Sequence, residues 1–429
     1  MTQSSRECTE QALARIADAN GEGQRSCLTL YSAQARDAAD AADARAKAGR
    51  PLGALDGTVI TIKDLFDVQG EVTRAGSAVL AQTAAPAQAD APAVARLRAA
   101  GAVIVAKTNM TEFAFSGVGA NPHFGTPGNP ADRTRIPGGS TSGGAVACAD
   151  GIGSIAIGTD TGGSTRIPAA LCGLVGFKPT QRRIPTAGAH PLSPTLDSIG
   201  PMAHSVAQCA LADAVLAAES GEALQAAGLR GLRIGVVQGV VLEDMDKHVA
   251  STFEHSLQRL SAARCADVSS SALALLDAVT QRGGIAPKEA FDGHRALLAT
   301  HADAIDPFVR ARMLGGADMS EEIYQQNLRE RAHAITQFDR VFDDFDVLAL
   351  PTTPITAPTQ AEVASPEGFA LKNRLLLRNT SIANFFDLCA ISLPAPEPGP
   401  LPCGFMLFGR SGADQALFRA ALAIEAAFK

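Results

Sequence analysis

The sequence predicts an α/β protein, in which helices and buried strands alternate along the chain and pack in layers. Short runs of β-branched and apolar residues recur between glycines and prolines, and segments with helical spacing separate these runs. The chain has 429 residues and a hydrophobic content of 46%, so it can bury a large core. Because no low-complexity linker or internal repeat divides it, we expect a single domain over residues 1–429.

The first half of the chain opens with two helices, rich in alanine and charged residues, that we expect to pack on the main body. An alternating strand then leads to Lys63, and a third helix starts with Pro92 in an early position. The expected helices are 7–18, 33–47, 92 to about 101, and 143–150, and the expected strands are 57–63, 103–105 and 154–157, with a turn over 158–164.

The second half continues the alternation and includes one long polar helix. The expected strands are 232–237, 346–350, 390–393 and 403–408, and the expected helices are 320–342 and a segment after Gly412. Within the domain we expect N-terminal helices (about 7–48), a core (about 52–215 and 340–429) and a variable helical region (about 240–340). The stretch rich in alanine and serine at 261–290 is the weakest candidate for an embedded boundary.

Charge and cysteine usage exclude several classes of protein. The net charge is −7 and no basic stripe is present, so direct nucleic-acid binding is not expected. No signal-peptide pattern and no apolar run of about 18–20 residues occurs, so no membrane association is expected. The eight cysteines form no CxxC pair and no zinc-type spacing, which favours a reducing, cytoplasmic setting.

Two serines and one lysine carry the chemical signal. Ser140 and Ser164 each follow a pair of glycines, and Lys63 follows an apolar strand. Glycines before a serine allow successive backbone N–H groups to form an anion-binding nest, which can stabilise the oxyanion of a tetrahedral intermediate. A buried lysine loses its preference for the charged form and can act as a general base. Taken one by one, the residues also fit two flexible turns, a phosphate-binding loop at Ser140 and a solvent-exposed lysine.

A Ser-His-Asp mechanism has no positive support in the sequence. Neither candidate serine lies in a Gly-x-Ser-x-Gly elbow. Only His123 is close to a loop rich in glycine and proline, and the later histidines lie in polar helical stretches where we expect them to be solvated. The eight histidines are His123, His190, His204, His248, His255, His294, His301 and His333.

Taken together, these motifs resemble the amidase signature family of serine amidohydrolases. The resemblance rests on VITIKDLFDVQGEVTRAGS around Lys63, AVIVAKTNMTEFAFSG at 102–117, the whole block 137–179, LDSIGPMAHSV at 196–206, LALPTTPITAP at 348–358 and LPCGFMLFGR at 401–410. It therefore runs through essentially the entire chain. It implies a large mixed central sheet covered by helices on both faces, and an enzyme that cleaves linear amide bonds without metal or organic cofactor.

The resemblance also implies roles for individual residues. Ser164 matches the nucleophile, Ser140 the bridging serine after a cis peptide bond with Gly139, and Lys63 the terminal base. Proton transfer from Ser164 through Ser140 to neutral Lys63 would give an acyl-enzyme that water then hydrolyses. The residues matching the oxyanion hole are Thr161, Gly162 and Gly163, with the N–H of Ser164, and those matching supporting positions are Asp160, Arg166, Gly139 and Thr141.

The substrate is expected to be a small carboxylic or urea-type amide, cleaved to an acid and ammonia or an amine. QRRIPTAGAH after Thr180 departs from the pattern of glutaminase subunits, while NPHFGTP at 121–127 and NFFDLCA at 384–390 are similar to free-standing amidases. An acidic amide is favoured if Arg182 or Arg183 faces the pocket. The pocket candidates are Phe115, Asn121, His123, Arg182, Arg183, Asn379 and Asn384.

Two other functions remain open. One is the glutamine amidase subunit of a tRNA-dependent amidotransferase complex, which would depend on a partner protein. The other is a non-catalytic member of the family, which the presence of all three catalytic-type side chains disfavours. The resemblance also favours a homodimer, because family members are often dimers.

Overall fold

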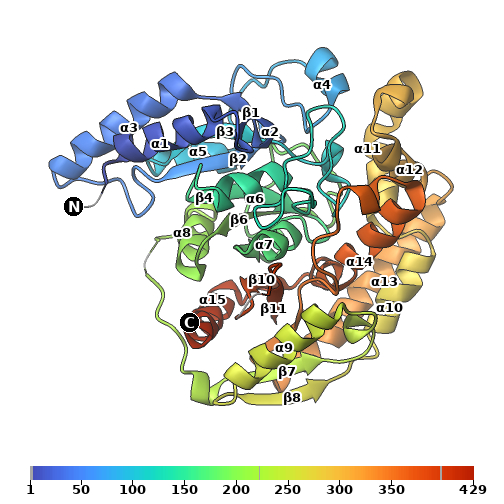
Figure 1. Cartoon of the computed structure of the whole chain (residues 1–429). Coiled ribbons are helices and arrows are strands. Elements are labelled where there is room, and N and C mark those ends of the chain that lie inside the picture. The colour runs from blue at the N-terminus through green and yellow to red at the C-terminus, as the bar shows by residue number, and fades with distance from the viewer. Residues whose placement is uncertain (1–2, 222, 397–398) are drawn as a thin grey trace.

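The computed structural model describes residues 3–221, 223–396 and 399–429, and they form a helical shell around one 11-stranded sheet (Figure 1). The strand order is β1-β3-β2-β4-β6-β5-β10-β11-β9-β7-β8. The strands are β1 (Cys27–Leu30), β2 (Val59–Lys63), β3 (Val103–Thr108), β4 (Ile155–Asp160), β5 (Val175–Lys178), β6 (Ser198–Ala203), β7 (Arg233–Val237), β8 (Arg264–Val268), β9 (Val347–Pro351), β10 (Cys389–Pro394) and β11 (Gly404–Gly409).

The sheet is mixed. Strand β2 runs parallel to its neighbours β3 and β4, and β7 runs parallel to β8 and β9. The pairs from β4 through β6, β5, β10 and β11 to β9 are antiparallel, as is the pair β1 and β3 at one edge. Parallel neighbours end at the same edge of a sheet, so the carboxyl ends of β2 and β4 lie side by side.

Successive side chains of the strands point to opposite faces, and each face is covered by helices. Ile155 and Ile157 pack into the core beneath α5, α8 and α15, whereas Ala156 between them packs against α6 and α7. In the same way, Val59 packs beneath α1 and α3 while Ile60 belongs to the opposite face. These helices are α1 (Ser5–Ala17), α3 (Ser32–Lys47), α5 (Pro92–Ala99), α6 (Ser142–Ala149), α7 (Arg166–Cys172), α8 (Val206–Leu216) and α15 (Asp414–Phe428).

The segment between β7 and β10 adds a second group of helices, of which α10 to α13 lie along the right side of Figure 1. It contains α9 (Lys247–Arg259), α10 (Leu273–Gln281), α11 (Ala286–His301), α12 (Pro307–Leu314), α13 (Glu321–Asp339) and α14 (Pro366–Phe385). The remaining short helices are α2 (Gly23–Ser26), α4 (Ala78–Thr83), η1 (Glu112–Ala114), η2 (Leu229–Gly231), η3 (Val240–Leu242), η4 (Ala302–Ala304), η5 (Arg340–Asp343) and η6 (Ala361–Val363).

The architecture confirms the predicted α/β class, with a large mixed sheet covered on both faces. Every strand and helix expected from the sequence is present, with ends that differ by a few residues. Strands β1, β5, β6 and β8 and helices α2, α4, α7, α8 and α14 were not expected. The stretch 261–290 contains β8, which extends the same sheet beside β7.

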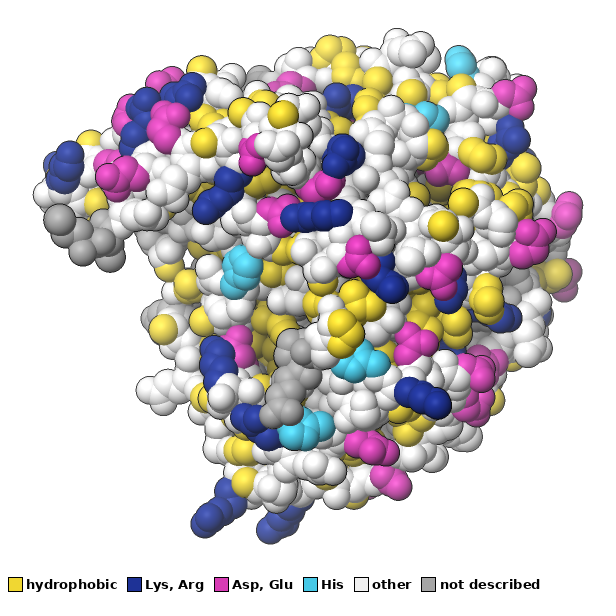
Figure 2. Space-filling view, viewed as in Figure 1, with side chains coloured by type: hydrophobic (Ala, Val, Ile, Leu, Met, Phe, Trp, Pro, Cys, Tyr) yellow, Lys and Arg dark blue, Asp and Glu magenta, His cyan; other side chains and the backbone are white. Residues whose placement is uncertain are grey.

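The surface carries charges of both signs. Figure 2 shows Lys and Arg side chains interspersed with Asp and Glu over the face in view. On α1 and α3, for example, Arg6 pairs with Glu10 and Asp40, and Arg36 also pairs with Glu10. Among the described residues, no helix is both long enough and apolar enough to span a membrane.

Candidate active site

The three predicted catalytic side chains come from neighbouring parts of the fold. Lys63 is the last residue of β2, Ser140 lies two residues before α6, and Ser164 lies in the loop that joins β4 to α7. The N–H of Thr141 donates to the carbonyl of Ser164 over 3.3 Å, so the loops of the two serines are in contact. The Gly139–Ser140 peptide bond is cis, and the N–H of Gly139 donates to the carbonyl of Gly117.

The Lys63 amino group is fully buried and lies among hydroxyl groups. Its Nζ is 2.8 Å from Ser140 Oγ and 3.0 Å from Thr159 Oγ1. Burial lowers the pKa of Lys63 from 10.5 to about 7, although the carboxylates of Asp160 and Asp197 oppose this shift. A substantial fraction of Lys63 is therefore neutral near pH 7.

Ser164 lies at a large cavity of about 870 Å³. Its hydroxyl has no hydrogen-bond partner within the described chain, so the oxygen is available to a ligand. The cavity wall is mainly apolar, with a few polar groups. Residues that line it beside Ser164 include Phe115, Thr161, Gly162, Arg312, Leu377 and Asn384.

The turn before Ser164 exposes backbone donors to this space. In the described structure, the N–H groups of Thr161, Gly162 and Ser164 have no protein acceptor. The N–H of Gly163, by contrast, donates to Asp160 Oδ1 over 2.8 Å, which differs from the expected oxyanion role for this residue. Gly163 has φ +135°, and a Cβ there would lie 2.2 Å from Thr380 Oγ1, so only glycine fits.

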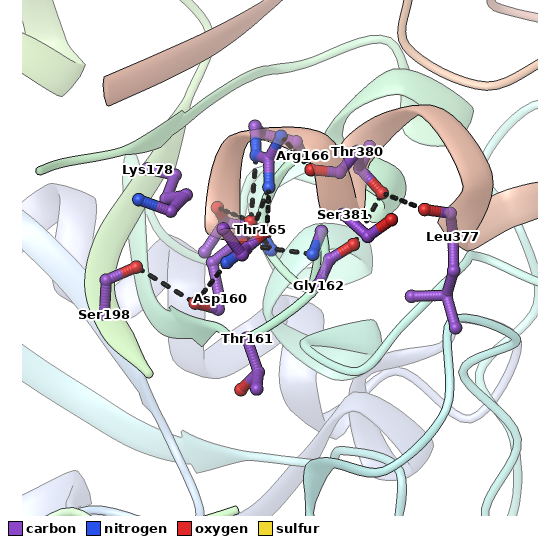
Figure 3. A network of polar contacts seen from close by, with 12 residues as sticks. Asp160, Thr161, Gly162, Thr165, Arg166, Lys178, Ser198, Leu377, Thr380 and Ser381 are labelled. Atoms are coloured by element: carbon purple, nitrogen blue, oxygen red, sulfur yellow. Dashed lines mark hydrogen bonds and ion pairs between the residues drawn. The ribbon is translucent and has the colours of Figure 1, made fainter. Parts of the chain in front are cut away.

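A buried ion pair between Asp160 and Arg166 supports the turn (Figure 3). The Asp160 carboxylate accepts hydrogen bonds from the N–H groups of Gly163 and Thr165 and from the Arg166 guanidinium. Burial alone would raise the pKa of Asp160, but the charge of Arg166 and the hydrogen bonds from the side chains of Arg166 and Asn384 hold it well below its usual range. The network fixes the backbone around Ser164.

Helix α14 completes the network, and no local pattern in the sequence indicated its role. Arg166 donates to the carbonyl of Thr380 and to Asn384 Oδ1, and Asn384 Nδ2 donates back to Asp160. Thr380 Oγ1 donates to the carbonyl of Gly162 over 2.6 Å (Figure 3). The predicted pocket residue Asn384 therefore both lines the cavity and supports the turn.

Three arginines that the sequence analysis missed line the cavity, Arg374 and Arg378 on α14 and Arg312. Arg312 is the one whose guanidinium stacks on Phe115. It lies on α12, its guanidinium is 4.4 Å from the centre of the Phe115 ring, and Nε donates to the Phe115 carbonyl. No carboxylate pairs with it among the described residues, and burial lowers its pKa to about 10. Arg312 thus presents an unpaired positive charge to the cavity that Ser164 lines.

Of the other predicted pocket residues, Phe115 lines the cavity, but Asn121, His123, Arg182 and Arg183 do not. Asn121 donates to the carbonyls of Gly76 and Met110, and His123 Nε2 lies 3.0 Å from a carboxylate oxygen of Glu112. Arg183 is held by the carboxylates of Asp213 and Glu219, and Arg182 is exposed with φ +67°. These carboxylate partners hold Arg183 outside the cavity lining.

The structure also gives the positions of Asn379, the later histidines and Thr141. Asn379 also lies outside the cavity lining, because its amide donates to the carbonyls of Val241 and Pro351. The expectation that the later histidines are solvated is wrong for His294, which is buried with its Nε2 3.0 Å from His190 Nε2. The Thr141 hydroxyl is buried and has no hydrogen-bond partner in the described part of the chain.

Metal ligands are not assembled near these residues. Within the residues described, no group of three or more His, Cys, Asp or Glu side chains could hold a metal ion. The side chains around Ser164 instead supply hydroxyls, a lysine and backbone N–H groups.

Comparisons with known proteins find matches that cover nearly the whole chain. A family model described as Amidase matches residues 7–418. A protein of Comamonas testosteroni named 2-amino-5-chloromuconic acid deaminase is 37% identical over 411 residues, covering 93% of this chain and 87% of the relative. A glutamyl-tRNA(Gln) amidotransferase subunit of Halobacterium salinarum is 35% identical over 415 residues, covering 88% of this chain and 97% of the relative.

The structural comparison gives the same result. A crystal structure of an amidase superimposes with a TM-score of 0.88 at 31% identity, covering 99% of this chain and 96% of that chain. The chain therefore belongs to the amidase family, whose members are carbon–nitrogen hydrolases.

Proposed function

We propose that this amidase cleaves its substrate through a covalent acyl-enzyme on Ser164, with Ser140 and Lys63 as a proton relay. The observation that carries the proposal is the distance of 2.8 Å between Lys63 Nζ and Ser140 Oγ in a fully buried setting. Burial favours the neutral amine, which has the lone pair that a general base needs. A lysine held by an ion pair would stay protonated and could not take up the proton.

In the first half of the reaction, Ser164 Oγ attacks the carbonyl carbon of the amide. Its proton passes to Ser140 Oγ while the Ser140 proton passes to Lys63 Nζ, so the relay moves one proton and leaves Ser140 neutral. The carbonyl π bond opens and its electron pair becomes an oxyanion. Collapse of this intermediate breaks the C–N bond, and the relay runs in reverse to deliver the proton to the leaving nitrogen.

Water then attacks the acyl-enzyme in the same way. Lys63 and Ser140 take a proton from the water and return it to Ser164 Oγ as the ester bond breaks. The products are a carboxylic acid and ammonia or an amine. The free N–H groups of Thr161, Gly162 and Ser164 are the donors we assign to the oxyanion, while Gly163 acts through Asp160.

We further infer that the substrate is a small amide that carries a carboxylate. Arg312 supports this, because a guanidinium without a protein carboxylate is suited to bind one from the substrate. The chloromuconic acid deaminase of Comamonas testosteroni also acts on an acid. Phe115 under the guanidinium would hold it in place for this contact.

Glutamine also carries a carboxylate, so Arg312 does not separate a free-standing amidase from the glutaminase subunit of an amidotransferase. Relatives of both kinds resemble this chain. The departure from the glutaminase pattern at residues 181–190 disfavours the glutaminase. We therefore retain the free-standing amidase as the proposal.

The test is ammonia release by the purified chain alone. The panel holds glutamine and aliphatic, aromatic, dicarboxylic and urea-type amides, with Ser164→Ala as the control for background release. Hydrolysis of a carboxylate-bearing amide other than glutamine, lost in the Ser164→Ala variant, supports the proposal. Release that persists in that variant would contradict the assignment of Ser164, and release from glutamine alone would contradict the free-standing amidase.

A further inference from the structure

Asp197 joins two walls of the active site and belongs to none of the groups assigned so far. It lies directly before β6, and its carboxylate is buried. One oxygen, Oδ1, accepts the hydroxyl of Thr161 over 2.5 Å. The other, Oδ2, accepts the N–H groups of Leu192 and Ser193 over 3.0 and 3.1 Å.

The bond to Thr161 acts on the part of the site where the oxyanion would form. Thr161 follows Asp160 and precedes Gly162, and its own N–H is one of the donors without a protein acceptor in the described chain. Asp160 holds this turn at Gly163 and Thr165, beyond Gly162. The Asp197 carboxylate is the contact that fixes the side chain of Thr161 at the other end of the turn.

The same carboxylate also fixes a second segment of the cavity wall. Leu192 and Leu196 line the cavity, and the loop between them folds back on Asp197 through the two N–H bonds to Oδ2. The N–H of Asp197 in turn donates to the carbonyl of Ser193. A shift of the carboxylate would therefore move Thr161 and the apolar wall together.

Asp197 also acts on Lys63 through its charge. The charged groups that face Lys63 are Asp160 on β4 and Asp197, and those that face Asp197 are Lys63 and Glu289 on α11. Burial raises the pKa of Asp197 to about 6, although the Thr161 hydroxyl and the two N–H groups oppose this shift. Above that pH the carboxylate is ionised and raises the pKa of Lys63, against the effect of burial.

We propose that Asp197 is a positioning residue, which holds the Thr161 N–H in place for the oxyanion and keeps a negative charge beside Lys63. The proposal rests on the proposed function, because it assigns Thr161 to the oxyanion site and Lys63 to the base. It adds Asp197, in the LDSIGP segment, to the residues that position the active site. It also assigns a role to the Thr161 hydroxyl, which binds this carboxylate. Asp197 itself touches neither the substrate nor the reacting atoms.

The experiment follows the reaction of Ser164 with a fluorophosphonate, which needs no knowledge of the natural amide. Ser164 Oγ forms a bond to phosphorus, the P–F bond breaks, fluoride leaves, and the serine proton passes to the relay. The second-order rate constant is measured between about pH 5 and 9, because a general base gives a sigmoidal rise through its pKa. The variants are Asp197→Asn, Thr161→Val and Thr161→Ser, and Ser193→Ala is the matched control in the same loop.

For Asp197→Asn we expect the plateau rate to fall roughly 10-fold or more, because an oxyanion donor is displaced. We also expect the midpoint of its pH–rate curve to lie at lower pH than in the wild type, because Lys63 loses a neighbouring negative charge. Damage to the fold alone would lower the fraction of active enzyme without moving the midpoint. For Ser193→Ala we expect the wild-type midpoint, because the N–H bond to Asp197 is retained and the hydroxyl that is removed donates to Glu289 and not to Asp197.

The two variants of Thr161 keep the proposal testable if Asp197→Asn does not fold. Thr161→Val removes the hydroxyl and should lower the plateau, and Thr161→Ser restores the hydroxyl and should recover most of the loss. An unchanged rate and midpoint in Asp197→Asn, or equal rates in the valine and serine variants, would overturn the role of Asp197. Absence of labelling at Ser164 in the wild type would instead overturn the proposed function.

Discussion

Replacing Lys63 with methionine isolates the charge that the relay depends on. Lys63 is fully buried at the end of β2, so a linear apolar side chain of similar length can occupy the same space. The fall of its pKa from 10.5 to about 7 corresponds to roughly 5 kcal/mol by which the folded protein disfavours the ammonium form. Methionine removes both this cost and the base.

The activity prediction follows from the protonation state. In the wild type, the rate of Ser164 phosphonylation should rise with pH through about 7, because only the neutral amine accepts the Ser140 proton. In Lys63→Met the rate should fall by roughly 10²- to 10⁴-fold, the usual contribution of a general base. The sigmoidal rise should disappear as well.

The same substitution should raise the free energy of unfolding, although it lowers the activity. Because the folded-state pKa lies below the unfolded one, the unfolded chain binds more protons between about 7 and 10.5, and wild-type stability rises with pH across this range. The cost of burying the charged Lys63 is fully present below about pH 7. The gain in free energy of unfolding of the methionine variant over the wild type should therefore be largest there. Urea unfolding at several pH values measures this difference.

The matched control is Lys107→Met. Lys107 is also a buried lysine, on the neighbouring strand β3, with Nζ 3.5 Å from Glu71, and it does not line the cavity. Its replacement should leave the pH midpoint of Ser164 labelling where it is. A Lys63→Met variant that keeps the wild-type rate and midpoint, or a wild-type midpoint far from 7, would refute the reasoning.

Three other predictions concern the relay, the substrate and the scaffold. Ser140→Ala should slow Ser164 labelling by roughly 10²-fold or more without loss of fold, because the hydroxyl between base and nucleophile is gone; circular dichroism checks the fold. Arg312→Met should lower kcat/KM for a carboxylate-bearing amide roughly 10- to 100-fold and spare a neutral analogue. Arg310→Met, on the same helix but paired with Asp303, should leave both unchanged. Asp160→Asn should cost about 3–5 kcal/mol in urea unfolding, because it leaves Arg166 buried without its partner. That loss should shrink on acidification, because the stability that comes from the lowered pKa of Asp160 is fully present above the unfolded-state pKa and is lost as the pH falls toward the folded-state pKa.

Local patterns predicted the elements that carry the candidate serines and lysine. Apolar alternation located β2 with Lys63 at its end, and the small residues after Ser140 located α6. Glycine pairs marked the turn before Ser164, where Gly163 has a backbone conformation that needs glycine. These features depend on neighbours in the sequence, so periodicity and composition reveal them.

Features that depend on distant contacts were beyond such patterns. Thr380 and Asn384 reach the turn from α14, more than 200 positions along the chain, and a threonine or asparagine in a helix gives no signal of its own. The sequence analysis predicted an arginine for an acidic substrate but chose Arg182 or Arg183. The ion pairs of Arg183 with acids on other elements, and the lack of any for Arg312 in the described chain, are decided only by the tertiary structure.

The most direct test of the account is to find which residue forms the covalent bond. The wild-type enzyme is treated with a fluorophosphonate, and the adduct is located by peptide mass spectrometry. The account predicts one adduct, on Ser164, formed much more slowly in Lys63→Met and Ser140→Ala and absent in Ser164→Ala. An adduct on Ser140, or labelling of equal speed in the Lys63→Met variant, would contradict it.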